Sequence, residues 1–326
     1  MERLRTKPVR LPRLPARAMQ TPLLGRHLHH RSQHLTLPRF SSKSSLNSRP
    51  TLSFADSDIR RPFSMTSPSS RDRLQHAFNP GVYERIREFW FEKAGNDHEL
   101  ILPPMDLAKQ WFTSDPDFDK VCRDTFGEQL RLMQSGTVTA SDLLNTTASL
   151  KPLDWLGLIL LLDQIPRNCY RGSEAKVAFD VFDPIAIAVT LRAIEQGIPD
   201  APEIRYHAGY RLWFYLPLQH SEKLEIHELS MKEHARIFTD MKDLMASPEE
   251  DVVGDAKLKQ CRKFLLENRE AVDKWEDMLV GFARRHMTVI DRFGRYPHRN
   301  QALGRESTAE EAKYLAEGGE TFSSGK

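Results

Sequence analysis

The sequence has few cysteines and no long hydrophobic run. The three cysteines, Cys122, Cys169 and Cys261, are widely separated, form no CxxC pair and are odd in number. This pattern is typical of a reducing compartment and gives no sign of a disulfide framework. The longest strongly apolar run, Trp155 to Leu162, has eight residues, whereas a helix needs about 20 to cross a bilayer. We therefore expect no membrane-spanning helix, and we interpret this run as a helix that is buried on all sides.

Acidic residues are almost absent from the first 64 residues. This segment contains 13 of the 47 Lys and Arg residues but only three of the 45 Asp and Glu residues, with none from Arg3 to Ala55. Its composition, rich in Arg, Ser, Pro and Leu, is typical of an organellar transit peptide. The sequence Arg-Pro-Phe-Ser at residues 61–64 resembles the pattern that a matrix protease cleaves. We therefore expect residues 1–64 to be a disordered leader that directs mitochondrial import.

The same leader also allows a second interpretation. Prolines at positions 8, 12, 15 and 22 break the amphipathic helix that import receptors prefer. Alternatively, translation starts at Met65 and the protein is cytoplasmic. In both cases the leader lies outside the predicted fold, because its composition does not support a packed core.

The rest of the chain lacks a basic excess. Residues 65–326 hold 34 Lys and Arg but 42 Asp and Glu, and general nucleic-acid binding needs a basic footprint. The stretch 292–305 is an exception, because it contains four arginines and a histidine but no acid. A short basic stretch in an acidic background suits a small anionic ligand better than a long polyanion. We therefore predict no nucleic-acid partner and no membrane partner.

Strand patterns are missing after the leader, whereas helical signals recur. There is neither regular alternation of apolar and polar residues nor an Asn-Gly or Asp-Gly hairpin signal. Prolines follow the capping residues Asn79 and Asp115, Gly197 follows an apolar helical stretch, and Ser307 with Glu310 forms a capping box. Helices are predicted over residues 105–112, 116–135, 152–163, 174–182, 184–196, 203–215, 222–245, 257–268 and 270–292.

These signals predict an all-α protein. We expect a single multi-helix domain over residues 72–318, preceded by the disordered basic leader and followed by a disordered tail over residues 319–326. Short connections favour helix pairs that stack in the manner of tetratricopeptide repeats. Because no repeat occurs at the period of about 34 residues, this comparison concerns the architecture alone.

Three segments place polar side chains directly against apolar helices, at a proline or a glycine. They are LLDQIPRNCYRG (161–172), YLPLQHSE (215–222) and RFGRYPHRNQALGRES (292–307). Surface loops rarely need such side chains there, whereas pockets do. We therefore expect these three segments, together with the predicted helix 270–292 that leads into the third, to contribute nine side chains to one cavity. They are Asp163, Arg167, Asn168, His220, Glu222, His286, Arg292, Arg295 and Arg299.

Histidines and carboxylates of these segments are the candidate catalytic groups. His220 is a candidate general base oriented by Glu222; alternatively, both residues only cap the following helix. His286 lies on the apolar stripe of the predicted helix 270–292 and is either a hydrogen-bonded core residue or a second proton carrier. Asp163 ends an apolar helix, and a buried carboxylate needs a partner, which is either a structural arginine or a group of the site.

Arginines dominate the candidate binding groups, because a guanidinium holds a phosphate or carboxylate through two parallel hydrogen bonds. The predicted ligand-binding residues are Arg167, Asn168, Arg171, Arg292, Arg295, His298, Arg299, Asn300 and Arg305. The sequence contains neither HExxH nor paired histidines at metal-binding spacing. We therefore predict no metal and no other cofactor.

Together the three segments resemble the domain-of-unknown-function family 924. Its members carry a run similar to LLDQIPRNCYRG, a YLP-x-x-HSE motif, a terminal RFGRYPHRNQALGRESTAEEAKYL and an FWF motif, here residues 89–91. The resemblance covers residues 80–318. Ile165, Leu218 and Gln219 depart from the family pattern, which has Phe, Phe and Met there, so the differences concern packing. The resemblance implies an all-α, tetratricopeptide-like fold and implies no activity.

The sequence is compatible with two functions. In the first, a cationic pocket binds or acts on a small phosphate- or carboxylate-bearing molecule. In the second, the chain is a helical scaffold whose concave face binds an acidic peptide or partner protein. Prolines, glycines and short spacings in the three segments fix the direction of their side chains, which favours the pocket. Whether the protein is an enzyme stays open.

Overall fold

The computed structural model describes residues 70–136 and 138–322, and within these ranges every regular element is helical. The prediction of an all-α protein is confirmed. The predicted leader and residues 323–326 of the predicted tail lie outside the described residues. None of the described helices is both long and apolar enough to cross a membrane.

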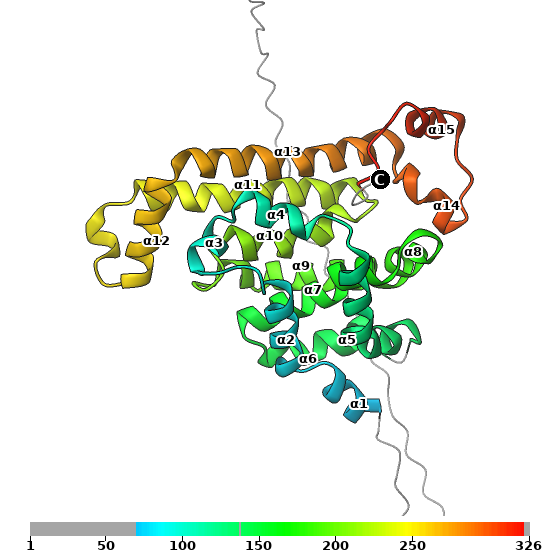
Figure 1. The fold of residues 1–326 in the computed structure, drawn as a ribbon, viewed down its shortest axis with the longest axis horizontal. Coiled ribbons are helices and arrows are strands. Elements are labelled where there is room, and N and C mark those ends of the chain that lie inside the picture. The colour runs from blue at the N-terminus through cyan, green and yellow to red at the C-terminus, as the bar shows by residue number, and fades with distance from the viewer. Residues whose placement is uncertain (1–69, 137, 323–326) are drawn as a thin grey trace, which may run out of the picture. The chain divides into compact units, whose positions relative to one another are not determined.

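Helices follow one another with short connections (Figure 1). The first half of the described chain contains α1 (Ser70–Ala77), α2 (Pro80–Trp90), α3 (Asp97–Ile101), α4 (Met105–Trp111), α5 (Pro116–Gln134), α6 (Ala140–Thr146), η1 (Thr147–Ser149), α7 (Pro152–Cys169), η2 (Gly172–Glu174), α8 (Ala175–Val177), η3 (Ala178–Phe182), α9 (Asp183–Glu195) and η4 (Ile198–Asp200). The second half contains α10 (Ala208–Gln219), α11 (Leu224–Ala246), η5 (Glu249–Val252), α12 (Ala256–Glu267), α13 (Arg269–Phe293), η6 (Pro297–Arg299), α14 (Asn300–Leu303) and α15 (Ala309–Ala316).

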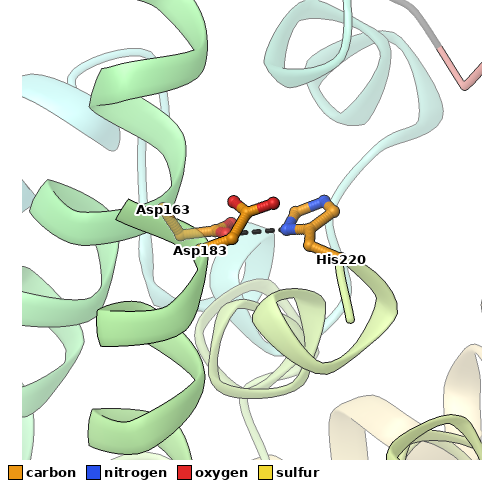
Figure 2. A group of neighbouring side chains, drawn as sticks. All are labelled: Asp163, Asp183 and His220. Atoms are coloured by element: carbon orange, nitrogen blue, oxygen red, sulfur yellow. Dashed lines mark hydrogen bonds and ion pairs between the residues drawn. The ribbon is translucent and has the colours of Figure 1, made fainter. Parts of the chain in front are cut away.

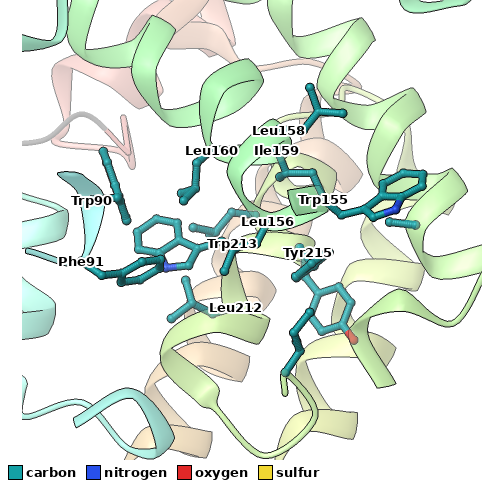
Figure 3. Packing of buried hydrophobic residues seen from close by; sticks show 14 of the residues in the cluster. Trp90, Phe91, Trp155, Leu156, Leu158, Ile159, Leu160, Leu212, Trp213 and Tyr215 are labelled. Atoms are coloured by element: carbon teal, nitrogen blue, oxygen red, sulfur yellow. The ribbon is translucent and has the colours of Figure 1, made fainter. Parts of the chain in front are cut away.

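Helix α7 lies at the centre of the core. It packs against α2, α5, α9 and α10, and all its residues from Asp154 to Pro166 are buried. Figure 3 shows Trp155 and Leu156 of α7 beside Trp213 and Tyr215 of α10. A helix that is apolar on every face is stable only when it is covered on every face, so the apolar run determines the place of α7.

Long helices α11 and α13 lie side by side (Figure 1). The stripe predicted for α13 faces inward, because Val272, Trp275, Leu279, His286 and Val289 are all buried. Gly294 ends α13 in the left-handed conformation, with φ of 66°, which a glycine adopts without steric cost. The last turn of α13 therefore leads directly into the arginine-rich stretch.

Several predicted boundaries are wrong. Helix α7 continues past Asp163 and through Pro166, and α10 spans Ala208–Gln219 rather than residues 203–215. The capping box lies one residue later than predicted, at Thr308 and Glu311, whose side chains bond to each other's backbone N–H. The stacking of helix pairs in the manner of tetratricopeptide repeats stays a prediction.

Close crossing of α2 and α7 requires a glycine at position 157. A Cβ atom there would lie 2.3 Å from the carbonyl oxygen of Tyr83. We expect Gly157→Ala to lower the free energy of unfolding by about 1–3 kcal/mol, because backbone atoms must move apart. The matched variant Gly281→Ala lies in α13, where the nearest atom to a Cβ is Nη1 of Arg285 at 3.9 Å. It should raise stability by up to about 1 kcal/mol through helix propensity. Urea unfolding measures both, and equal effects would contradict the packing argument.

Candidate functional site

A cavity of about 350 Å³ lies where the ends of α7 and α10 meet α13 and η6. Its polar lining residues are Thr113, Ser114, Gln164, Arg167, Asn168, Arg171, His220, His286, His298, Arg299 and Thr321. Its aromatic lining residues are Trp111, Phe112, Tyr170, Phe179, Phe282, Tyr296 and Phe322. Seven predicted site residues from the three segments and α13 therefore converge on one cavity, although they are far apart in the sequence.

Prolines explain why polar side chains meet at this place. Pro166 and Pro217 lie in the last turns of α7 and α10, and each lacks the N–H that would bond to the carbonyl four residues earlier. Both helices end within three residues of the proline, at Cys169 and Gln219. The polar residues that follow these buried helices are therefore held at the wall of the cavity.

Asp163 and His220 form a hydrogen-bonded pair at the wall (Figure 2). Nδ1 of His220 lies 2.7 Å from Oδ1 of Asp163, whose side chain is buried. Gln164 Nε2 donates to the other carboxylate oxygen at 2.6 Å. Because a carboxylate accepts, Nδ1 carries the proton and Nε2 carries the lone pair. Figure 2 shows the second ring nitrogen on the side away from the aspartate.

Local charges set the protonation states of this pair. Burial raises the pKa of the Asp163 carboxyl, but the charges of His220 and Arg167 and the hydrogen bonds lower it further, to about 2. Burial and the Arg167 charge hold the pKa of His220 below its usual value, against the opposing effect of Asp163. At neutral pH the pair is thus an ionised carboxylate beside a neutral imidazole, the arrangement of an oriented general base.

Asp183 connects two arginines of the site. Arg167 Nη2 donates to its Oδ1, and Arg299 Nη1 donates to its Oδ2 and to the backbone carbonyl of His220, both at 3.1 Å. The Arg299 guanidinium lies over the rings of Phe179 and Tyr296, at 4.4 and 4.6 Å. Asp183 is not among the predicted site residues; it directly precedes the predicted helix 184–196, and its place beside the apolar Phe182 was the available signal.

Arg171 is held in the same way by a second unpredicted aspartate. Its Nε and Nη2 both bond to the carboxylate of Asp119, and Nη2 also donates to Oδ1 of Asn168 at 2.9 Å. The charges of Arg167, Arg171 and Arg299 are thus balanced by three aspartates. The expected cationic pocket is therefore corrected to a charge-balanced one.

Each of these arginines nevertheless has one terminal nitrogen outside its ion pairs. Nη1 of Arg167, Nη1 of Arg171 and Nη2 of Arg299 have no hydrogen-bond partner among the described residues. Nε of Arg167 and Nε of Arg299 are buried and likewise have no hydrogen-bond partner among the described residues.

Glu222 and Arg305 lie outside the cavity lining, contrary to the prediction. Arg305 donates through both terminal nitrogens to the Glu222 carboxylate, at 2.6 and 2.9 Å, and the Tyr296 N–H donates to the same group at 2.9 Å. Glu222 therefore holds the chain around Tyr296 and does not orient His220. Asp163 has that role, and it lies behind His220 rather than on the cavity surface.

Arg292, Arg295 and Asn300 also lie outside the cavity lining. Arg292 pairs with Glu310, and Arg295 bonds to the Glu311 carboxylate through Nε and Nη2 at 2.6 and 2.8 Å. Asn300 Nδ2 donates to the same Glu311 carboxylate at 3.3 Å. These residues hold α15 in place, because the capping box at Thr308 and Glu311 directs the Glu311 carboxylate toward them.

Two further histidines line the cavity. Nδ1 of His286 lies 3.0 Å from the carbonyl oxygen of Phe282, one turn earlier in α13. His286 is thus both a hydrogen-bonded core residue and a residue of the cavity wall. Nδ1 of His298 is buried and has no hydrogen-bond partner in the part of the chain that the structure describes. Burial and the Arg299 charge lower the pKa of His298 to about 3.

Within residues 70–136 and 138–322, one group of side chains is a candidate for metal binding: Asp163, Asp183 and His220. One potential ligand atom from each lies within 4.8 Å of the others. However, all four carboxylate oxygens already accept a hydrogen bond, three of them from the guanidiniums of Arg167 or Arg299. Two guanidinium charges at these carboxylates would repel a divalent cation. The arrangement fits charge pairing better than a metal site.

Comparison with known proteins gives a family match over most of the chain. A model described as "Bacterial protein of unknown function (DUF924)" matches residues 86–319. The solved structure of a protein of unknown function from Agrobacterium tumefaciens has 26% identity and a TM-score of 0.46, and the match covers 73% of this chain and 98% of that chain. No curated protein matches the sequence.

Buried histidines should make the protein sensitive to mild acid. Burial lowers the pKa of His286 well below 6.5 and that of His234 to about 4, and His298 is lowered to about 3. An unfolded histidine takes up a proton near pH 6.5, so below this pH the unfolded state binds more protons than the folded state. The contribution of these histidines to the free energy of unfolding is therefore fully present above pH 6.5. As the pH falls below 6.5, the free energy of unfolding decreases by about 1.4 kcal/mol per pH unit for each such histidine.

A single substitution tests this relation. His298→Gln should reduce the slope of unfolding free energy against pH, between pH 6 and 4.5, by about 1.4 kcal/mol per pH unit. Urea unfolding at each pH gives the slope, and a variant with the wild-type slope would show that His298 takes up its proton in the folded state.

Proposed function

The chain belongs to the DUF924 family, whose description assigns no activity, and from the residues of its cavity we propose a function. The cavity binds a small molecule that bears a phosphate or carboxylate, and His220 accepts a proton from that molecule or from a water beside it. The observation that carries this proposal is the 2.7 Å contact between Nδ1 of His220 and the buried Asp163, at a wall shared with three arginines.

Asp163 supports the proton transfer in two ways. By accepting from Nδ1 it keeps the lone pair of His220 on Nε2, and by staying ionised it stabilises the imidazolium that forms. Its own pKa of about 2 means that it does not take the proton itself. A neutral histidine with a lowered pKa is ready to act as a base at neutral pH.

Arginines whose charges are already balanced can still bind an anion. A ligand oxygen accepts hydrogen bonds from the remaining nitrogens of Arg167, Arg171 and Arg299, and such bonds are stronger than neutral ones. Because the aspartates hold the guanidiniums in place before binding, little side-chain entropy is lost when the ligand arrives. Affinity then depends on the direction of these donors rather than on an attractive net charge.

Anion binding can be measured by thermal unfolding at fixed ionic strength. Phosphate at 100 times its dissociation constant adds about 2.7 kcal/mol to the stability of the wild type, which raises the melting temperature by about 5–10 °C. Arg171→Lys should lose most of this rise, because lysine cannot keep both its contact with Asp119 and a donor toward the ligand.

Arg295→Lys is the matched control for Arg171→Lys. Arg295 makes an equivalent two-point contact with Glu311, outside the cavity, so this variant should lose intrinsic stability and keep the full response to phosphate. A wild type that responds to neither phosphate nor small carboxylates contradicts the proposal and favours the helical scaffold that binds an acidic peptide.

Asp163→Asn tests the base. Because the Asp163 charge raises the pKa of His220, its removal should lower this pKa further. The protonated fraction of His220 at a given acidic pH should then fall below that of the wild type, as measured by NMR of ¹⁵N-labelled histidine. His234 is the internal control, because its lowered pKa has no contribution from Asp163. An unchanged or raised pKa of His220 refutes the pairing.

A further inference from the structure

The last described residues, Gly318–Phe322, leave α15 and return to the cavity. Gly318 has φ of 83°, which turns the chain at the end of α15. Gly319 then lies flat against the ring of Tyr314, where a Cβ atom would be 2.4 Å from a ring carbon. This path brings Thr321 and Phe322 to the cavity wall.

Phe322 covers the imidazole of His286. The two rings are stacked, with centroids 3.5 Å apart and an angle of 20° between their planes. The rings of Phe282 and Tyr296 meet Phe322 edge to face, at 6.0 and 5.8 Å. Three aromatic groups therefore surround a place that accommodates a planar apolar group, and a side chain of the protein itself fills it.

This placement of Phe322 carries a backbone cost. Its φ of 49° is the only positive value outside glycine among the described residues, and the left-handed conformation costs a non-glycine residue about 1–2 kcal/mol. Phe322 is only partly buried. Glu320 makes an exposed ion pair with Arg285 at 3.2 Å, which contributes little, and its N–H donates to the Tyr314 hydroxyl at 2.8 Å. The stacking of Phe322 on His286 must therefore offset the free-energy cost of its backbone conformation, and a competing ring can take the place of the Phe322 ring.

We propose that Phe322 is a displaceable plug over the subsite for a planar apolar group of the ligand. The inference rests on the proposed function and names its ligand class: an aryl or similar flat group that carries a phosphate or carboxylate. The ligand's ring stacks on His286 after Phe322 leaves, and its anionic group reaches the arginines of the same cavity. With Phe322 in place the cavity measures about 350 Å³, at the small end of ligand pockets, and the place that Phe322 leaves would add room for the ligand's ring.

Phe322→Ala tests the plug with two probes, phenyl phosphate and inorganic phosphate, by isothermal titration calorimetry on the full chain. Displacing Phe322 reduces the wild-type affinity for any ligand that uses the subsite. The variant should therefore bind phenyl phosphate about tenfold more tightly and bind inorganic phosphate within about twofold of the wild type. Phe118→Ala, which removes a partly buried ring of α5 outside the cavity lining, should change neither affinity.

The reactivity of His286 provides a second measurement without ligand. Because Nδ1 of His286 is engaged with the Phe282 carbonyl, Nε2 is the atom that reacts with diethyl pyrocarbonate. The reaction at His286, followed by peptide mass spectrometry, should be at least about fivefold faster in Phe322→Ala than in wild type or Phe118→Ala, because the stacked ring no longer covers it.

The outcomes separate the two proposals. The subsite inference is overturned if Phe322→Ala binds phenyl phosphate more weakly than the wild type, or if its affinities for phenyl phosphate and inorganic phosphate rise equally. Unchanged reactivity of His286 in Phe322→Ala overturns the plug. If the wild type and the variants bind neither probe, the proposed function fails, and the subsite that depends on it fails with it, whatever the reactivity of His286.

Discussion

Asp183 accepts hydrogen bonds from Arg167 of α7 and Arg299 of η6, and the rest of the pocket is built around this contact. It joins three parts of the chain, and the first and the last of them are over a hundred residues apart in the sequence. Arg299 in turn bonds to the backbone of His220, so the same contact fixes the place of the imidazole. A buried carboxylate that loses its partners costs several kcal/mol, so the contacts of Asp183 with the two arginines must form together. The pocket therefore exists only when α7, α9, α10 and η6 are all in place.

A second buried charge network shows what an arginine with a purely structural role looks like. Arg211 is fully buried, and all three of its side-chain nitrogens donate, to Tyr215, Asp240, Asp200 and a backbone carbonyl. No nitrogen is left for a ligand. In the pocket, by contrast, Arg167, Arg171 and Arg299 each have a terminal nitrogen without a hydrogen-bond partner among the described residues. Burial and ion pairing are common to both networks, which therefore differ in the guanidinium donors that remain unpaired.

Sequence reasoning predicted the helices well and the contacts of the C-terminal arginines poorly, for physical reasons. Helix periodicity and caps are local, so the inward stripe of α13 and the prolines that end α7 and α10 could be found in the sequence. Arg295 and Arg299 are four residues apart in one basic stretch, yet one holds Glu311 and the other reaches Asp183. Spacing in an irregular segment does not determine direction. Asp183 and Asp119 were missed because a lone aspartate near a helix start also has an ordinary role as a cap.

Protonation of the pocket depends on how dry it is. Burial is the largest cause that lowers the pKa values of His220, His286 and His298, and the ring of Phe322 covers part of the wall they share. A plug that leaves would admit water, and water would return these pKa values toward their usual range. A ligand with its own ring would restore the dry environment when it stacks on His286. Because the usual pKa of a histidine is about 6.5, His220 stays mostly neutral at neutral pH with or without the ring. What a dry wall changes is the free-energy cost of charging the imidazole once it accepts a proton.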